Sequence, residues 1–347
     1  MIRIAVRCPN WVGDTIMATP TLAHLRTQYP QAEITAIAQR NCQAILENNP
    51  HIDHLWIARD RSLRELARLV GRVRRGKFDL AIMLPNSLRS ALLFALAGVP
   101  KRIGYGRDGR SFLLTHRVEA TAFHFQCHQV EYYLGVLADL PACHIEEAER
   151  KLILAPNDEH RRGIKALLEE RGLDGNQFLA AVCPGAAYGS SKCWRPERYA
   201  QVADWLTENC GATVLLLGAP AEAALCRQIA ELCRRPAYDL RSEVSLGGLV
   251  ALCERLGLMV TNDCGAMHVA AAMRVPLVAI FGATDPRRTS PYDPEAAVVE
   301  RIAECGCDIA PCYKRICPID HRCMTAVTVA DVESAIERQI QRLRARS

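Results

Sequence analysis

The stretch TNDCGAMHVAAAMRVPLVAIFGATDP, residues 261–286, carries the pattern that decides the fold. It follows a short apolar run at 258–260, continues through a helix of small residues at 266–272, and ends in a second apolar run at 277–281. Two buried strands joined by a helix form a βαβ unit, in which the strands run parallel. We therefore expect an α/β protein whose parallel sheets are covered by helices on both faces.

The same alternation recurs along the chain and restarts after the charged segment EEAERKLILAPNDEHRR, residues 146–162. At 347 residues the chain has the length of about two domains. We expect two doubly wound, Rossmann-like domains over residues 1–155 and 156–347. The expected strands are 2–6, 33–38, 80–84 and 102–103 in the first domain and 178–183, 213–217, 258–260 and 277–281 in the second. The expected helices are 15–28, 42–48, 59–77, 87–97, 158–171, 197–208, 221–232, 266–272 and 329–342, the last of them packing back on the first domain.

The composition is that of a globular protein, with half of the residues hydrophobic and 23% charged. No apolar run reaches the roughly 18 residues that a membrane span requires. The opening MIRIAVR is a short strand interrupted by charges and lacks the organisation of a signal peptide. We therefore expect a cytoplasmic protein, in which the 16 cysteines remain thiols or bind metal.

Basic residues concentrate in RDRSLRELARLVGRVRRGK, residues 59–77, where eight of them stand against Asp60 and Glu65. Leu63, Leu66, Val70 and Val73 fall at helical spacing, which predicts an amphipathic helix with a basic outer face. A solvated face is the simpler interpretation, and attraction to an anionic lipid or glycolipid is the alternative. Because no nucleic-acid motif accompanies the basic residues, we expect no nucleic-acid partner.

Two loops that follow strands in the first half carry polar side chains. Ligands of doubly wound sheets bind outside the carboxyl ends of the strands. In NWVGD, residues 10–14, Gly13 permits a tight turn and Asp14 begins a helix. A helix cap is the simpler interpretation of this carboxylate, and a general base is the functional one. In LPNSLRSALLF, residues 84–94, Asn86, Ser87 and Arg89 are suited to a hydroxylated partner.

Two loops of the second half are suited to a nucleotide diphosphate. CPGAAYGSSKCWRPERYA, residues 183–200, combines glycines with hydroxyls and Lys192, although its spacing is not that of a P-loop. Asp263, Gly265 and His268 fall within six residues, and Gly265 opens a helix whose free amides can hold an anion. A packing role would explain His268 alone, but the convergence of these residues favours a nucleotide site.

Four motifs together resemble glycosyltransferase family 9, the lipopolysaccharide heptosyltransferases, and most closely its heptosyltransferase II branch. They are PNWVGDTIMATP, LPNSLRSALLFALAGVPKRIGY, PGAAYGSSKCWRPERYA and TNDCGAMHVAAAMRVPLVAIFGATDP, and the likeness runs from residue 1 to about residue 286. The resemblance implies a GT-B fold with the active site in the cleft between two Rossmann-like domains. It implies inverting transfer of L-glycero-D-manno-heptose from ADP-heptose to the inner-core heptose of heptosyl-Kdo2-lipid A, a lipid A-core glycolipid at the cytoplasmic membrane face.

Individual residues match the functional positions of the family. Asp14 matches its proposed catalytic base. Lys192 matches the lysine at the donor diphosphate, and Glu222 resembles an acidic residue that holds the ribose, although a helix-dipole role explains Glu222 equally well. The remaining positions expected at the donor are Ser190, Ser191, Asp263, Cys264, Gly265 and His268, with Cys264 standing where the family often has serine. The positions expected at the acceptor are Asn10, Trp11, Asn86, Ser87 and Arg89.

Charge compensation by lysine and a helix N-terminus implies that no metal or other cofactor is required, with a divalent cation as a stimulator at most. CGCDIAPCYKRICPIDHRC, residues 305–323, places five cysteines beside His321. This segment lacks paired Cys-x-x-Cys motifs, so a structural zinc between Cys305 and Cys323 is less favoured than packed thiols or a disulfide formed on isolation. We expect a monomer.

Three alternatives remain. Another family 9 enzyme, of heptosyltransferase I or III type, differs only in its acceptor. A non-catalytic sugar-nucleotide-binding module would keep the motifs of the second half and lose the base, which the presence of Asp14 disfavours. A Rossmann oxidoreductase would need G-x-G-x-x-G after the first strand, and residues 8–14 lack it.

Overall fold

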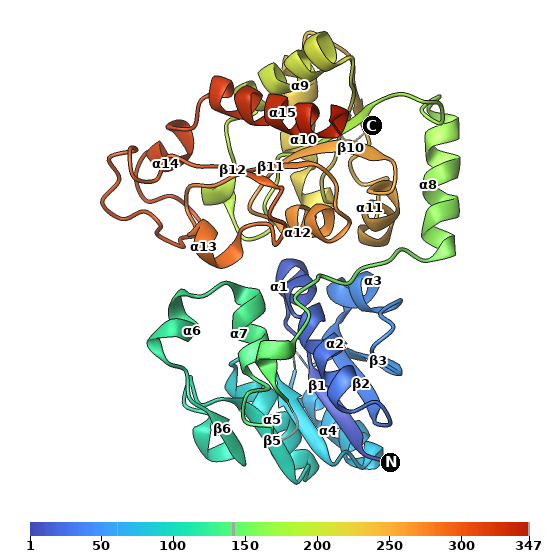
Figure 1. Cartoon of the computed structure of the whole chain (residues 1–347), viewed down its shortest axis with the longest axis vertical. Helices are drawn as coiled ribbons and strands as arrows, with labels where there is room; N and C mark the ends of the chain where they lie inside the picture. The colour runs from blue at the N-terminus through green and yellow to red at the C-terminus, as the bar shows by residue number, and fades with distance from the viewer. Residues whose placement is uncertain (61, 141–142, 346–347) are drawn as a thin grey trace. The chain divides into compact units, whose positions relative to one another are not determined.

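The computed structural model describes residues 1–60, 62–140 and 143–345. The chain divides into two compact units, Met1–Leu154 and Ala155–Ser347. Each unit contains one six-stranded sheet in which every neighbouring pair of strands is parallel, with helices on both faces (Figure 1). The α/β fold predicted from residues 261–286 is therefore confirmed.

The first unit has the strand order β3-β2-β1-β4-β5-β6. Its strands are β1 (Arg3–Arg7), β2 (Glu33–Gln39), β3 (His54–Ala58), β4 (Leu80–Met83), β5 (Lys101–Tyr105) and β6 (His116–Val118). Its helices are α1 (Val12–Met17), α2 (Thr19–Gln28), η1 (Arg40–Cys42), α3 (Gln43–Leu46), α4 (Leu63–Gly76), α5 (Leu88–Ala97), η2 (Ser111–Leu113), α6 (Ala122–Gln126), α7 (Gln129–Gly135) and η3 (Ile145–Glu147).

The second unit has the order β12-β11-β10-β7-β8-β9, which is the same topology. Its strands are β7 (Leu179–Cys183), β8 (Thr213–Leu216), β9 (Ala237–Asp239), β10 (Leu256–Asn262), β11 (Leu277–Ile280) and β12 (Ala297–Val299). Its helices are α8 (Asp158–Glu170), η4 (Ser190–Lys192), α9 (Pro196–Cys210), η5 (Pro220–Glu222), α10 (Ala223–Leu232), α11 (Leu246–Leu252), α12 (Gly265–Ala272), α13 (Pro286–Thr289), α14 (Arg322–Thr325) and α15 (Val329–Arg344).

The strand order reverses once in each sheet, between β1 and β4 in the first unit and between β7 and β10 in the second. Such reversals leave a crevice at the carboxyl ends of the two central strands, where doubly wound proteins bind ligands. The loops after β1, β4, β7 and β10 are the four loops that the sequence singled out.

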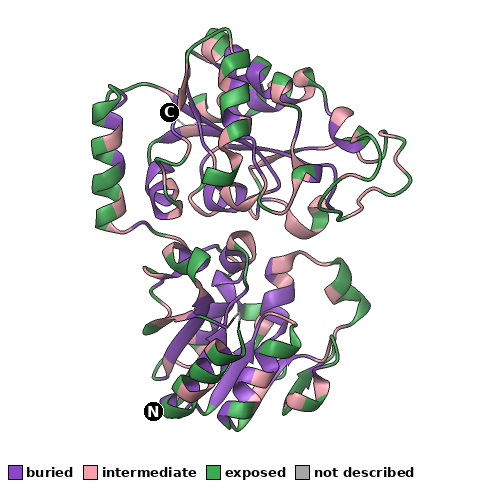
Figure 2. Cartoon of the chain, turned by 180° about the vertical axis from the view of Figure 1, so that it is seen from behind, coloured by how far each residue is buried: buried purple, intermediate pink, exposed green. Residues whose placement is uncertain are grey.

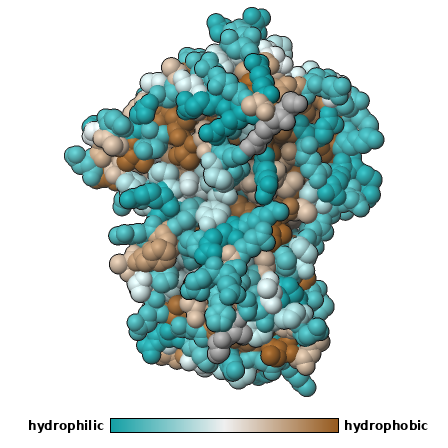
Figure 3. All heavy atoms as spheres, viewed as in Figure 1, coloured by the Kyte–Doolittle hydropathy of each residue, from teal (hydrophilic) through white to brown (hydrophobic). Residues whose placement is uncertain are grey.

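The core of each unit lies between its sheet and the covering helices, as the purple interior of Figure 2 shows. In the first unit α4 and α5 pack on one face through Leu66, Leu69, Val73, Phe94 and their neighbours. In the second unit α9 and α15 pack on one face around the buried Trp194. Figure 3 shows the visible surface as mainly hydrophilic, with separate small apolar patches.

Helix α15 buries its apolar face in the second unit, on α9, β11 and β12 (Figure 1). Val332, Ala335 and Ile336 belong to the core of that unit. This helix was expected to pack on the first domain, but its apolar stripe instead packs on the sheet that precedes it in the chain.

Several local predictions were wrong. The helix expected at 15–28 is broken at Ala18 into α1 and α2, because Pro20 occupies the first turn of α2 and cannot continue the α1 hydrogen-bond ladder. Leu63 was assigned to the buried stripe of α4 but is 80% exposed, and Leu69 takes its place. Arg61 of the basic segment lies outside the described residues. None of the helices in the described part of the chain has the length and apolar character needed to cross a membrane.

Candidate active site

Asp14 lies in the first turn of α1, at the end of the loop after β1. The N-cap of this helix is Trp11, whose extended backbone precedes the first helical residue, so the cap interpretation of Asp14 is wrong. The Asp14 carboxylate instead accepts a hydrogen bond across the fold, because the Tyr133 hydroxyl in α7 donates to its Oδ1 over 2.9 Å. Asp14 is half-buried, so the residue is still partly accessible to a substrate hydroxyl.

A polar cavity of about 310 Å³ lies at the switch point of the first unit. The buried Arg7 donates to Asp60 Oδ2 over 3.3 Å, and Gln39 donates to Asp60 Oδ1 over 3.0 Å. The Arg89 guanidinium donates to the Asp60 carbonyl. The cavity therefore presents amide and guanidinium groups already oriented by one buried carboxylate. Its lining residues are Arg7, Asn10, Gln39, Asp60, Ser87, Arg89 and Ser90.

Three of the five residues predicted at the acceptor thus lie together in this cavity, and the other two lie elsewhere. Asn86 donates to the Tyr132 hydroxyl over 2.7 Å and accepts from Arg110 Nη2 over 3.1 Å. Arg110 is fully buried, which lowers the pKa of its guanidinium to about 10. Asn86 therefore links the buried side chains of Tyr132 and Arg110. Trp11 is the N-cap of α1 and is exposed.

Lys192 and Asp263 form a buried ion pair at the switch point of the second unit. The distance from Lys192 Nζ to Asp263 Oδ2 is 2.6 Å, and the side chains are 12% and 5% exposed. The Thr284 hydroxyl donates to the same oxygen over 2.6 Å. Lys192 Nζ also lies 4.9 Å from the centre of the Tyr188 ring. Asp263 is thus held by the loop after β11 and orients the ammonium of Lys192.

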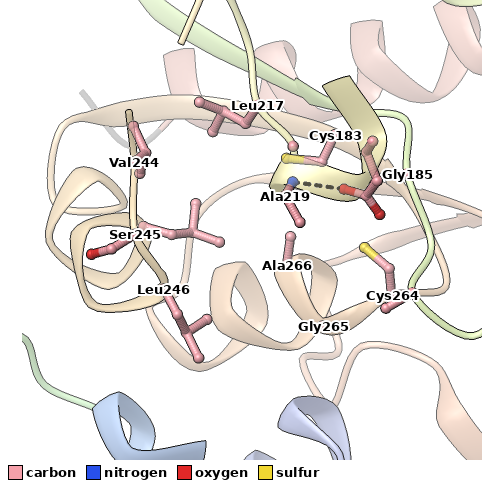
Figure 4. Close-up of a pocket in the computed structure, with 14 residues that line it drawn as sticks. Cys183, Gly185, Leu217, Ala219, Val244, Ser245, Leu246, Cys264, Gly265 and Ala266 are labelled. Carbon is pink, nitrogen blue, oxygen red and sulfur yellow. Dashed lines mark hydrogen bonds between the residues drawn. The ribbon is translucent and has the colours of Figure 1, made fainter. Parts of the chain in front are cut away.

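A second cavity, of about 210 Å³, lies between the loops after β7 and β8 and the starts of α11 and α12 (Figure 4). Leu217, Val244, Leu246 and Leu249 give it apolar walls. Glu222, Cys264 and Gly265 are the predicted donor residues that line it. A pocket with apolar walls and one carboxylate at its edge is suited to a flat base attached to a diol.

The Glu222 side chain accepts a hydrogen bond within its own helical turn and also lines the cavity. Its Oε2 accepts a hydrogen bond from the Ala219 amide over 2.8 Å, drawn as the dashed line in Figure 4, which closes the first turn of η5. The carboxylate lies against Gly185, where a Cβ would stand 2.0 Å from Glu222 Cδ. The helix-terminus interpretation of Glu222 is therefore correct in part, and the same carboxylate still faces the cavity.

Two thiols face this cavity. Cys264 is the N-cap of α12, and its Sγ lies 3.2 Å from the Thr261 hydroxyl. Burial raises the pKa of both Cys264 and Cys183, so these side chains remain neutral thiols at pH 7. Gly265 and Ala266 line the cavity at the start of α12, and hydrogen bonds from the Ala266 and Met267 amides to the Cys264 thiol partly offset the effect of burial on its pKa.

The loop after β7 rests on residues 313–315, which we call the strut segment. The Ser191 amide donates to the Arg315 carbonyl over 3.1 Å, and the Tyr188 hydroxyl donates to the Tyr313 carbonyl over 2.5 Å. The Ser191 hydroxyl donates to the Lys314 carbonyl. Ser191 is therefore buried against the strut segment, whereas Ser190 is exposed.

His268 and the Cys-rich segment stand apart from the two cavities. His268 is only 3% exposed within α12 and does not line the second cavity. The cysteines at 305, 307, 312, 317 and 323 are free thiols. No cluster of three or more histidine, cysteine or acidic side chains in the described ranges is arranged to hold a metal ion.

Tyr133 and the apolar walls of the second cavity were not predicted from the sequence. Tyr133 lies 119 residues from Asp14 in the chain, so no local spacing could connect them. The walls carried a signal, because SLGGLVAL at 245–252 is a short apolar run of helical character.

The model of glycosyltransferase family 9 (heptosyltransferase) matches residues 66–321. This match spans more than half of the chain, including both loops of the second switch point. The chain belongs to glycosyltransferase family 9. It is a glycosyltransferase, as the sequence predicted.

Named relatives and solved structures of family 9 cover nearly the whole chain. Lipopolysaccharide heptosyltransferase 2 of Salmonella typhimurium is 31% identical over 316 residues, covering 87% of this chain and 88% of that protein. The enzyme of the same name from Escherichia coli is 30% identical over 314 residues, with coverages of 87% and 88%.

Two solved structures superpose closely. The family 9 glycosyl transferase of Veillonella parvula has a TM-score of 0.85 and 25% identity, covering 98% of this chain and 97% of that one. The E. coli ADP-heptose lps heptosyltransferase II has a TM-score of 0.81 and 26% identity, with coverages of 98% and 99%. These matches confirm the GT-B class, with its two Rossmann-like units, and the likeness to the heptosyltransferase II branch.

Proposed function

We propose that the chain transfers L-glycero-D-manno-heptose from ADP-heptose to the inner-core heptose of heptosyl-Kdo2-lipid A, with inversion at the anomeric carbon. The relatives named above support heptosyl transfer in lipopolysaccharide core biosynthesis. The observation that carries the donor assignment is the cavity at the second switch point, which combines apolar walls, Glu222 and the start of α12 at Gly265.

The donor is bound in the second unit. The adenine occupies the apolar walls, and the Glu222 carboxylate accepts hydrogen bonds from the ribose hydroxyls. The diphosphate lies near Lys192 and the amides at Gly265, which stabilise the negative charge that builds up as the leaving group departs. Because Asp263 already compensates part of the Lys192 charge, these amides carry much of this stabilisation.

Asp14 acts as the base in the first unit. The acceptor hydroxyl gives its proton to the Asp14 carboxylate while its oxygen bonds to the anomeric carbon and the bond from that carbon to the diphosphate breaks. A carboxylate with a pKa near 4 is a weak base, so the proton moves late, once bond formation has made the hydroxyl acidic. The polar cavity that contains Asn10, Ser87 and Arg89 binds the acceptor sugar.

The acceptor is a lipid at the cytoplasmic membrane face, and α4 meets that surface. Arg64, Arg68 and Arg75 are exposed on this helix, and within the described ranges none of them forms an ion pair or hydrogen bond. An unpaired arginine row attracts anionic headgroups. We propose that the enzyme acts in the cytoplasm as a monomer that docks reversibly on the inner membrane.

Incubation of the purified protein with ADP-heptose and defined acceptors tests this function. ADP release and a product heavier by one heptose are expected with heptosyl-Kdo2-lipid A. Transfer to Kdo2-lipid A or to a longer core instead would assign the chain to the type I or type III enzymes. Donor binding without turnover on any acceptor would leave only a sugar-nucleotide-binding module.

Chelation tests the metal requirement. Since Lys192 and the α12 amides supply positive charge at the diphosphate, we expect dialysis against EDTA to leave turnover within a factor of about two. A loss of activity that Mg²⁺ or Zn²⁺ restores would show that a metal takes part.

A further inference from the structure

Asp14 is held by a residue that no motif of the chain indicates. The Tyr133 hydroxyl donates to Asp14 Oδ1 over 2.9 Å, from a helix that packs directly on α1. The Tyr133 side chain is itself fixed, because the residue is 7% exposed and its ring packs edge-on against Tyr132, with centroids 5.9 Å apart.

The neighbouring Tyr132 is connected to a different part of the unit. Its hydroxyl accepts from Asn86 Nδ2 over 2.7 Å, and Asn86 is bonded in turn to the buried Arg110. Two consecutive tyrosines of α7 thus contact the loop after β4 and the base after β1. The two hydroxyls differ in one respect that matters here, since only that of Tyr133 contacts the carboxylate.

We propose that Tyr133 is the positioning residue of the catalytic base, fixing the Asp14 carboxylate and favouring its ionised form. This inference rests on the proposed function only in calling Asp14 the base. A phenol that donates to a carboxylate stabilises the charged form, because a charge-assisted hydrogen bond is lost when the carboxylate is protonated. A fixed oxygen also keeps the base aligned with the acceptor proton.

Other titratable groups lie on the elements that pack on α1. The elements that pack on α1 are α2, η1, α3 and α7. Their titratable and charged side chains are His24, Arg26, Arg40, Cys42, Glu131, Tyr132 and Tyr133. Burial raises the pKa of Cys42, with repulsion from Asp14 adding to it, so this thiol stays neutral throughout the acidic range. Burial lowers the pKa of His24. Glu147 opposes this effect, and Arg150 and His144 add to it.

The test compares Tyr133→Phe with Tyr132→Phe. Each variant removes one hydroxyl and keeps the ring, so both retain the packing of α7. Loss of the Tyr133 hydroxyl raises the Asp14 pKa, so the acidic limb of the profile of kcat against pH moves to higher pH. We also expect kcat on the plateau to fall roughly tenfold, because the loss of one hydrogen bond changes a rate by about this factor. The KM for the donor should be unchanged. Tyr132→Phe should leave the acidic limb in place.

A second measurement does not require turnover. Proteins labelled with ¹³C at the aspartate carboxyl groups are titrated by NMR, and the Asp14 resonance is assigned by its loss in Asp14→Asn. Tyr133→Phe should raise the titration midpoint of that resonance, and 3-fluorotyrosine at position 133, a stronger donor, should lower it. An unchanged midpoint in both proteins would overturn the proposal. Failure of heptosyl transfer alone would overturn the function and leave this titration intact.

Discussion

Glu222 contacts both its own helix and the proposed ribose site, and one substitution separates these roles. In Glu222→Gln the side-chain oxygen can still accept the bond from the Ala219 amide, so the free energy of unfolding should stay within about 0.5 kcal/mol of the native value. The loss of charge weakens the hydrogen bonds to a diol, and we expect the Kd for ADP to rise roughly tenfold. Calorimetric titration with ADP and urea unfolding measure the two effects. Equal ADP affinity would show that Glu222 only ends its helix.

The Lys192 prediction depends on its ion pair with Asp263. Lys192→Met removes the ammonium and leaves a buried carboxylate, so it should lower both ADP affinity, by tenfold or more, and stability. The double variant with Asp263→Asn removes the unpaired charge while keeping an acceptor for the Thr284 hydroxyl. We expect it to regain stability without regaining ADP affinity, as measured by urea unfolding and calorimetry. Recovery of both would mean that Lys192 acts only as a structural partner.

At the scale of the element, the loop after β7 depends on the strut segment. Gly189 has φ of 158°, and a Cβ there would stand 2.1 Å from the Arg315 carbonyl oxygen. Because the atoms that this Cβ would meet belong to the Arg315 backbone, Gly189→Ala must displace one of the two chain segments, at a cost of roughly 2 kcal/mol or more. Urea unfolding should detect this loss together with weaker ADP binding. Gly172→Ala also has positive φ but no atom within 4 Å, so it serves as the control for replacing a positive-φ glycine without a steric clash.

The exposed arginines of α4 are expected to bind the protein to anionic membranes. Replacing Arg64, Arg68 and Arg75 by glutamate should reduce sedimentation with vesicles that contain phosphatidylglycerol by tenfold or more, since each basic side chain near an anionic surface contributes about 1 kcal/mol. The charge-matched control replaces the exposed Arg162, Arg227 and Arg338 of the second unit. Neutral phosphatidylcholine vesicles should bind neither variant nor the native protein. Equal losses in both triple variants would show that net charge, rather than α4, decides the binding.

At the scale of the whole molecule, stability should fall in acid. Asp204 accepts bonds from the Arg234 and Arg235 amides, and these bonds lower its pKa despite the opposing effect of burial. A carboxyl whose folded pKa lies below its unfolded value of about 3.9 stabilises the fold above that pH and loses the contribution below it. Burial lowers the pKa of His24, His51 and His124, so their protonation favours the unfolded chain below about pH 6.5. Urea unfolding at pH 7.5, 6, 4.5, 3.5 and 2.5 should show a modest decline down to pH 4.5 and a steeper one below pH 4, with Asp204→Asn flattening the decline below pH 4.

The central strands could be predicted from the sequence and the edges could not. β4, β7 and β11 are continuous apolar runs, and β1 and β10 contain apolar runs at 4–6 and 258–260, because both faces of a parallel sheet are buried. The strands β6, β9 and β12 have three residues each and one paired side, and they escaped notice. The site followed the same division. Residues close in sequence, such as Asp263 and Gly265, could be singled out by their spacing, whereas Tyr133 and the polar cavity around Asp60 depend on contacts between distant elements.

The strut segment has a consequence for exchanging parts between relatives. Three hydrogen bonds connect it to the loop after β7, yet the bonded residues lie at least 123 positions apart in the chain. A chimera that takes residues 183–195 from one heptosyltransferase and residues 300–321 from another would join two surfaces shaped for different partners. The loop after β7 and the strut segment must therefore come from the same parent protein. Recombination that keeps them together should keep nucleotide binding, and recombination that separates them should lose binding while every motif remains present.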